Sequence, residues 1–83
     1  MKTSQQVLDI INVKLKEHIS ILEQMKKDLE NMRAKMAEII QLQPGNKEAI
    51  FTQTTLVMTL KDRMMFHKAC VLQLTDLVKE INE

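Results

Sequence analysis

Residues 41–48 read QLQPGNKE, and this stretch decides the fold. Pro44 has no backbone N–H and pushes the residue before it out of the α region, so a helix cannot continue through it. Gly45 allows the chain a positive φ at no steric cost. Asn46 is a good N-cap, because its side chain can accept from the first free N–H groups of a following helix. The stretch therefore predicts a turn over 43–46 between two helices.

Apolar residues recur on both sides of this turn, with steps that alternate between three and four. We call these positions the seam. Before the turn the seam comprises Leu8, Ile11, Leu15, His18, Leu22, Met25, Leu29, Met32, Met36 and Ile39. After the turn it comprises Ile50, Gln53, Val57, Leu60, Met64, His67, Val71, Leu74, Val78 and Ile81. A sustained repeat of 3.5 residues is typical of a left-handed coiled coil.

The spacing predicts helices over about 4–42 and 47–82, with Thr3 and Gln6 forming a capping box at the first of them. Helices of nearly equal length joined by four residues must run antiparallel, seam against seam. The chain has one Gly, one Pro, no Trp and no Tyr, whereas sheets need frequent turn residues and favour aromatic ones. We predict an all-α antiparallel hairpin, a single domain over 1–83, that assembles into a four-helix or larger bundle.

Charge and composition exclude several classes of function. The net charge of +1 gives no general attraction to nucleic acid or to an anionic membrane. No apolar run is long enough to cross a bilayer, so membrane insertion is not expected. Lys26, Lys27, Arg33 and Lys35 are interleaved with acidic residues, which indicates a solvated charged face. The single cysteine, Cys70, excludes an intrachain disulfide and fits a reducing compartment. A cytoplasmic protein is predicted, with export of the uncleaved chain as an open alternative.

Many apolar residues lie off the seam, where one hairpin cannot bury them. Those next to the seam are Val7, Ile19, Ile21, Ile40, Leu56, Cys70 and Leu77. They widen each apolar stripe to the width expected in a multi-helix bundle.

A second apolar strip is predicted on the second helix. Phe51, Met58, Met65 and Leu72 recur every seven residues, and Phe66 lies beside them. Such a strip would be large for a soluble monomer, and Met side chains adapt to varied partner surfaces. We predict that these five residues bind a partner. The alternative is that they are buried inside a homo-oligomer.

Three polar residues interrupt the seam, namely His18, Gln53 and His67. The antiparallel register places the two imidazoles about one helical turn apart, so assembly should weaken as the pH falls through about 6. Together with Cys70 they could form a soft metal site, but no fourth ligand accompanies them and no metal is predicted. Gln53 either fixes the register or stays solvated near the turn.

No catalytic constellation is present, since the chain lacks a phosphate loop, a nucleophile elbow, HExxH and CxxC. We therefore predict no enzyme activity, no catalytic residue, no cofactor and no small-molecule substrate. The predicted function is a small interaction module, an adaptor or chaperone-like subunit, that binds itself as a homodimer or higher oligomer or binds another helical protein. The alternatives are a purely structural homo-oligomer and, as the weakest, a nucleic-acid-binding regulator.

Two equal helices joined at Gln43-Pro44-Gly45-Asn46 are similar in outline to several groups of short helical hairpins. These groups are the small co-chaperones and needle subunits of type III secretion systems, and small phage or plasmid regulators such as the RNA-binding hairpin dimer. The resemblance implies a co-chaperone or another component of a secretion apparatus. The regular heptads look more like a stable chaperone or scaffold than a filament subunit. The resemblance lies in shape, so no functional residue is carried over.

Overall fold

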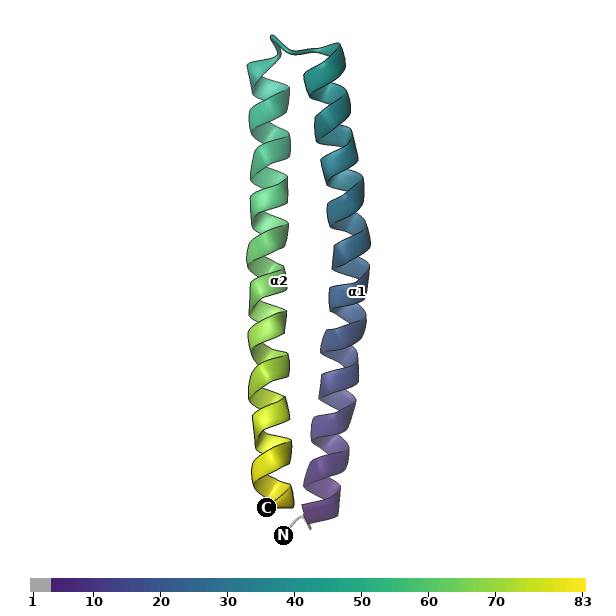
Figure 1. The fold of residues 1–83 in the computed structure, drawn as a ribbon, viewed down its shortest axis with the longest axis vertical. Helices are drawn as coiled ribbons and strands as arrows, with labels where there is room; N and C mark the ends of the chain where they lie inside the picture. The colour runs from purple at the N-terminus through teal and green to yellow at the C-terminus, as the bar shows by residue number, and fades with distance from the viewer. Residues whose placement is uncertain (1–3) are drawn as a thin grey trace.

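The computed structural model describes residues 4–83. Helix α1 (Ser4–Leu42) and helix α2 (Lys47–Asn82) run antiparallel and are joined by residues 43–46 (Figure 1). The predicted all-α hairpin is therefore confirmed, with both helices beginning and ending where the spacing predicts. Thr3, the expected N-cap of α1, lies outside the described residues.

Hydrogen bonds in the turn tie the two helix ends together. The side-chain oxygen of Asn46 accepts from the Ala49 backbone N–H at 3.1 Å, which confirms the predicted N-cap. The Asn46 amide also donates to the side-chain oxygen of Gln43 at 2.8 Å. The Asn46 backbone N–H donates to the Gln43 carbonyl at 3.0 Å, so Pro44 and Gly45 are the central residues of a β-turn.

The turn does not use the positive φ that Gly45 allows, because no glycine in residues 4–83 has a positive φ. A turn of type I has negative φ at both central positions, and Pro44 suits the first of them. The flexibility of Gly45 therefore contributes only to the entropy of the unfolded chain.

Replacing Gly45 by Ala is expected to stabilise the hairpin. A Cβ at this position would meet nothing within 4 Å. A Gly-to-Ala change at a compatible backbone position raises the free energy of unfolding by about 0.4–1 kcal/mol. Urea denaturation measures the change. Asn46→Ala serves as a control of opposite sign, since it removes the cap and should cost about 1 kcal/mol. A destabilised Gly45→Ala variant would show that the turn needs a conformation that Ala cannot adopt.

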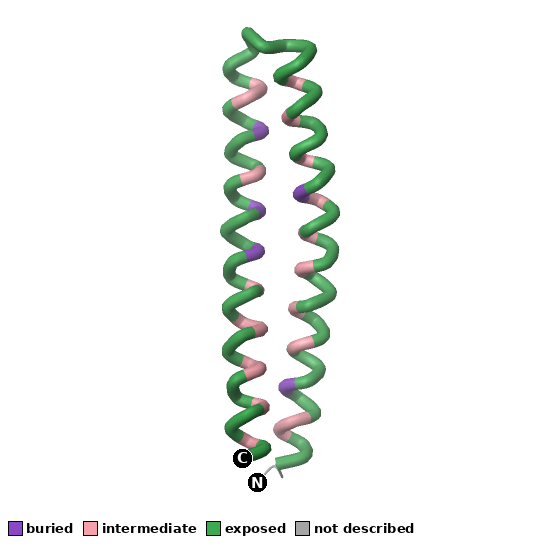
Figure 2. The backbone as a smooth tube through the Cα atoms, in the orientation of Figure 1, coloured by how far each residue is buried: buried purple, intermediate pink, exposed green. Residues whose placement is uncertain are grey.

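The core is a single line of contacts between the two helices. Every seam residue of α1 and α2 is buried or half-buried, and Figure 2 shows these residues facing one another. The most deeply buried apolar residues are Ile11, Leu29, Leu60 and Met64, at 7–9% exposure. Leu29, Leu60 and Met64 form one cluster. No described side chain is less than 2% exposed, so the core stays open at its flanks.

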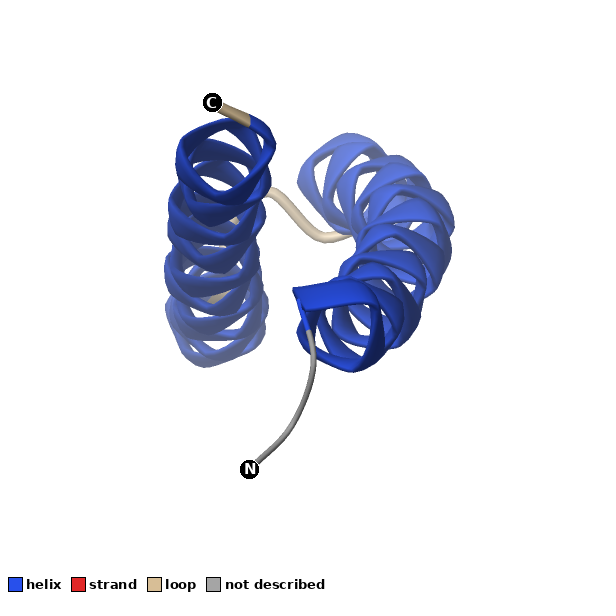
Figure 3. Cartoon of the chain, turned by 90° about the horizontal axis from the view of Figure 1, so that it is seen from below, coloured by secondary structure: helices blue, strands red, loops and turns tan. Residues whose placement is uncertain are grey.

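The hairpin is a rod that measures 61 × 19 × 15 Å. Viewed along its length, it is one layer of two helices with neither face covered (Figure 3). Its accessible surface is 6569 Å², whereas a compact monomer of this mass exposes about 5100 Å². A lone hairpin therefore leaves about 1500 Å² more surface in water than a globular chain would.

Candidate functional site: an exposed apolar strip and a polar seam

Four large apolar side chains form one column along α2. Phe51, Met58, Met65 and Leu72 are 60–73% exposed, and we call them the α2 strip. Because they are seven residues apart, they lie on one face of the helix. The seam occupies a different face, so formation of the hairpin leaves the strip uncovered.

Burial of this strip would supply a large free energy. Covering a Leu, Met or Phe side chain contributes about 1.5–3 kcal/mol, so four of them could contribute on the order of 6–12 kcal/mol before the cost of association. That is comparable with the whole stability of a small domain, which is about 5–15 kcal/mol.

Phe66 lies beside the strip rather than in its column. One residue further along a helix is about 100° further round it. The Phe66 ring is exposed and approaches His67 edge-on, with ring centroids 5.4 Å apart and an interplanar angle of 75°. The structure therefore associates Phe66 with the seam histidines more closely than with the strip.

A groove of about 270 Å³ runs between the helices beside Met65. Its apolar part comes from Leu29, Met64 and Met65. Its polar lining is wholly cationic and consists of Arg33, Lys61 and Lys68. Sequence spacing does not predict this group, because Arg33 joins the two lysines only when α1 packs against α2. The interleaved acids of α1 do not line the groove.

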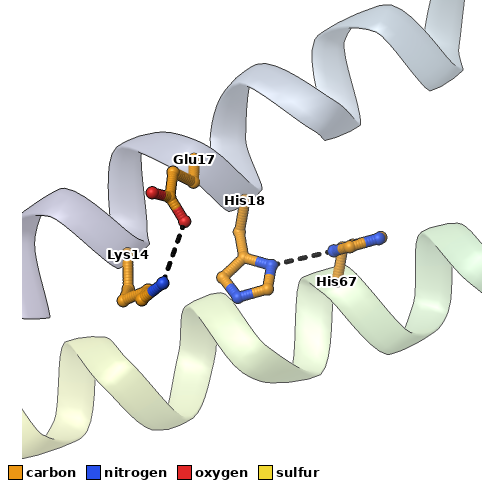
Figure 4. A network of polar contacts seen from close by, with 4 residues as sticks. All are labelled: Lys14, Glu17, His18 and His67. Atoms are coloured by element: carbon orange, nitrogen blue, oxygen red, sulfur yellow. Dashed lines mark hydrogen bonds and ion pairs between the residues drawn. The ribbon is translucent and has the colours of Figure 1, made fainter.

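The two seam histidines are in direct contact. The Nδ1 atoms of His18 and His67 lie 2.8 Å apart, and the ring centroids are 5.0 Å apart (Figure 4). The two side chains therefore bridge the distance of about one helical turn that the register predicts between positions 18 and 67. One Nδ1 must donate and the other accept, so the contact tolerates two neutral rings or one protonated ring, but not two protonated rings.

One cation, Lys14, lies close to the histidine pair. Lys14 lines the same hollow as His18 and Cys70, and its ammonium lies 3.4 Å from the Glu17 carboxylate at the surface (Figure 4). Cys70 is a half-buried free thiol. Within residues 4–83, no three His, Cys, Asp or Glu side chains are grouped so that they could hold a metal ion.

Gln53 is 4% exposed and is buried inside the seam. Its amide nitrogen donates across the helix pair to the Met32 carbonyl at 3.0 Å. The alternative in which Gln53 stays solvated is therefore wrong, because the short turn lets α2 pack against α1 from its second turn onward. A buried polar contact between two specific residues is a device that disfavours other registers.

Neither α1 nor α2 has an apolar stretch that could cross a membrane. Comparison with protein-family models, with curated proteins and with solved structures finds no match to this chain.

Proposed function

We propose that the protein is a non-enzymatic protein–protein interaction module, an adaptor or chaperone-like subunit, that binds its partner through the α2 strip. One observation carries the proposal. Four large apolar side chains stand 60–73% exposed in one column, on a hairpin in which only four apolar side chains of residues 4–83 are buried.

The dimensions of the rod support this proposal. A specific interface removes about 800 Å² from each partner. The hairpin exposes about 1500 Å² more total surface than a compact monomer of the same mass, which is more than such an interface requires. Contiguous exposed apolar patches mark sites of association. The strip is also rich in Met and Phe, which interfaces favour.

A purely structural homo-oligomer is the second candidate. It is favoured by further exposed aliphatic side chains outside the strip, which are Ile10, Val13, Ile19, Ile21, Ile40, Leu42, Leu56 and Leu77. A closed bundle would bury these residues together with the strip. A dye that fluoresces on exposed apolar surface separates the two candidates, since it should be bright with the interaction module and dark with the closed bundle.

Placing charges on the strip should abolish association. In the double variant Met58→Glu and Met65→Glu, two carboxylates would have to be buried in any complex, which is strongly unfavourable. Both residues are exposed in the hairpin, so helicity should not change. Light scattering gives the mass of the purified chain, affinity capture gives any bound protein, and circular dichroism gives the helix content.

The matched control is Ser20→Glu and Thr59→Glu, which adds the same charge at exposed positions off the strip. The control should associate as the unchanged chain does. The proposal is wrong if Met58→Glu and Met65→Glu together leave both the mass and the captured proteins unchanged.

A further inference from the structure

We propose that the occupant of the α2 strip is a second copy of this chain, and that the two hairpins pair in parallel with both turns at the same end. This inference rests on the proposed function and names its partner. It follows from the charges on the two sides of the strip.

The α2 strip has a basic edge and an acidic edge. The surface neighbours of a helical residue are three and four positions away. On the side nearer the seam these neighbours are Lys47, Thr54, Lys61, Lys68 and Thr75. On the other side they are Glu48, Thr55, Asp62, Ala69 and Asp76. The first edge thus holds three cations and no anion, and the second holds three anions and no cation.

These six charged residues are exposed and unpaired within the hairpin. Among the described residues, the ion pair that forms is Lys14–Glu17 on α1. The basic edge also continues across the groove, where Arg33 of α1 joins Lys61 and Lys68. A partner on the strip therefore meets cations on one side and carboxylates on the other.

The symmetry of the pair decides how these edges meet. When two copies are related by a two-fold axis parallel to the helices, the basic edge of each lies against the acidic edge of the other. When the axis is perpendicular to the helices, like edges meet, and Lys61 faces Lys61 while Asp62 faces Asp62. Juxtaposed like charges select against an arrangement, whereas opposite charges fix the register. The six charges of the two edges therefore select the parallel pair. Lys79, the next residue of the column after Leu72, meets its own counterpart at the end of that pair.

The apolar column fits the same arrangement. In a parallel two-fold pair each strip residue meets its own counterpart, so Phe51, Met58, Met65 and Leu72 form four layers one heptad apart. The acidic edge of the second copy then faces the groove, where Arg33, Lys61 and Lys68 can receive Asp62.

A lipid surface or a nucleic acid fits this face less well than a second copy of the chain does. A lipid surface or a nucleic acid would be attracted to the basic edge but repelled by the acidic edge on the same face. The two edges carry equal and opposite charge, and the strip between them is apolar. A second copy of the chain satisfies all three features at once.

Disulfide cross-linking tests the pairing and its direction. In a Cys70→Ser background, Met58→Cys and Met65→Cys are prepared singly and oxidised. The parallel pair brings each cysteine to its own counterpart, so each variant alone should form a covalent dimer at least tenfold faster than the exposed control Thr59→Cys. In an antiparallel pair Met58 would face Met65, and only a mixture of the two variants would cross-link quickly, which would overturn the proposal.

Charge reversal tests the role of the edges. Lys61→Asp with Lys68→Asp should weaken dimerisation at least tenfold, measured by sedimentation at several concentrations. Adding Asp62→Lys and Asp76→Lys makes the two edges opposite in charge again over residues 61–76 and should restore dimerisation. An unchanged dimer in the first variant would contradict the role of the charges.

Failure of this inference differs from failure of the proposed function. If the strip serves a foreign protein, the chain is monomeric and neither cysteine variant cross-links faster than the control. Capture of that protein is still lost in the Met58→Glu and Met65→Glu variant. If both mass and capture are insensitive to the strip, the proposed function itself is wrong.

Discussion

Replacing Leu60 by Ala is expected to lower the free energy of unfolding by about 2–4 kcal/mol. Leu60 is 8% exposed and packs with Leu29 and Met64 in the main core cluster. The change deletes apolar contacts from a core in which four apolar residues of the described part of the chain are buried, and rigid helix backbones on both sides limit how far the cavity can collapse. A loss of this size is a large fraction of the stability of an 83-residue chain. Urea denaturation followed by circular dichroism measures it.

Leu72→Ala is the matched control, because it removes the same atoms from a side chain that is 66% exposed. Its effect on the stability of the monomer should stay within about 0.5 kcal/mol, while association through the strip weakens. The comparison must be made at a concentration where the chain is monomeric, since association adds to the apparent stability. Equal losses in the two variants would mean that the seam does not hold the hairpin together.

Breaking the contact between the two seam histidines is expected to destabilise the hairpin. The Nδ1 atoms of His18 and His67 lie 2.8 Å apart, and both residues are half-buried. Replacing either ring by Leu leaves the remaining imidazole without this hydrogen-bond partner, which costs on the order of 1 kcal/mol.

The double variant His18→Leu and His67→Leu removes both partners together, so it should lose less stability than the sum of the two single variants. Urea denaturation of the three variants measures this coupling. Strictly additive losses would contradict the prediction.

The sequence predicted what depends on spacing along one helix. The alternation of seam residues from Leu8 to Ile81 and the cap at Asn46 are local properties, and the structure agrees with both. The sequence predicted less well the contacts that depend on how far a side chain extends. The rings of His18 and His67 bridge a full turn, and the Gln53 amide crosses to a backbone carbonyl, because rotamers rather than sequence spacing set these contacts.

Features made by both helices together were the hardest to predict. Arg33 lies among interleaved charges in the sequence, yet it lines a groove with Lys61 and Lys68 once the hairpin forms. Gly45 illustrates a different difficulty. Glycine permits a positive φ but does not require one, and the β-turn around Pro44 uses negative values.

Because α1 and α2 run antiparallel, the rod is mechanically weak when it is pulled in one particular direction. Both helix ends away from the turn lie at the same pole of a 61 Å rod (Figure 1). Tension applied between Ser4 and Asn82 would peel the seam open one layer at a time, so each layer resists alone. A load spread along the side of α2 would be shared by all layers of seam contacts at once. The hairpin is therefore much better suited to bearing a neighbour along its side than to joining two objects that pull on its ends.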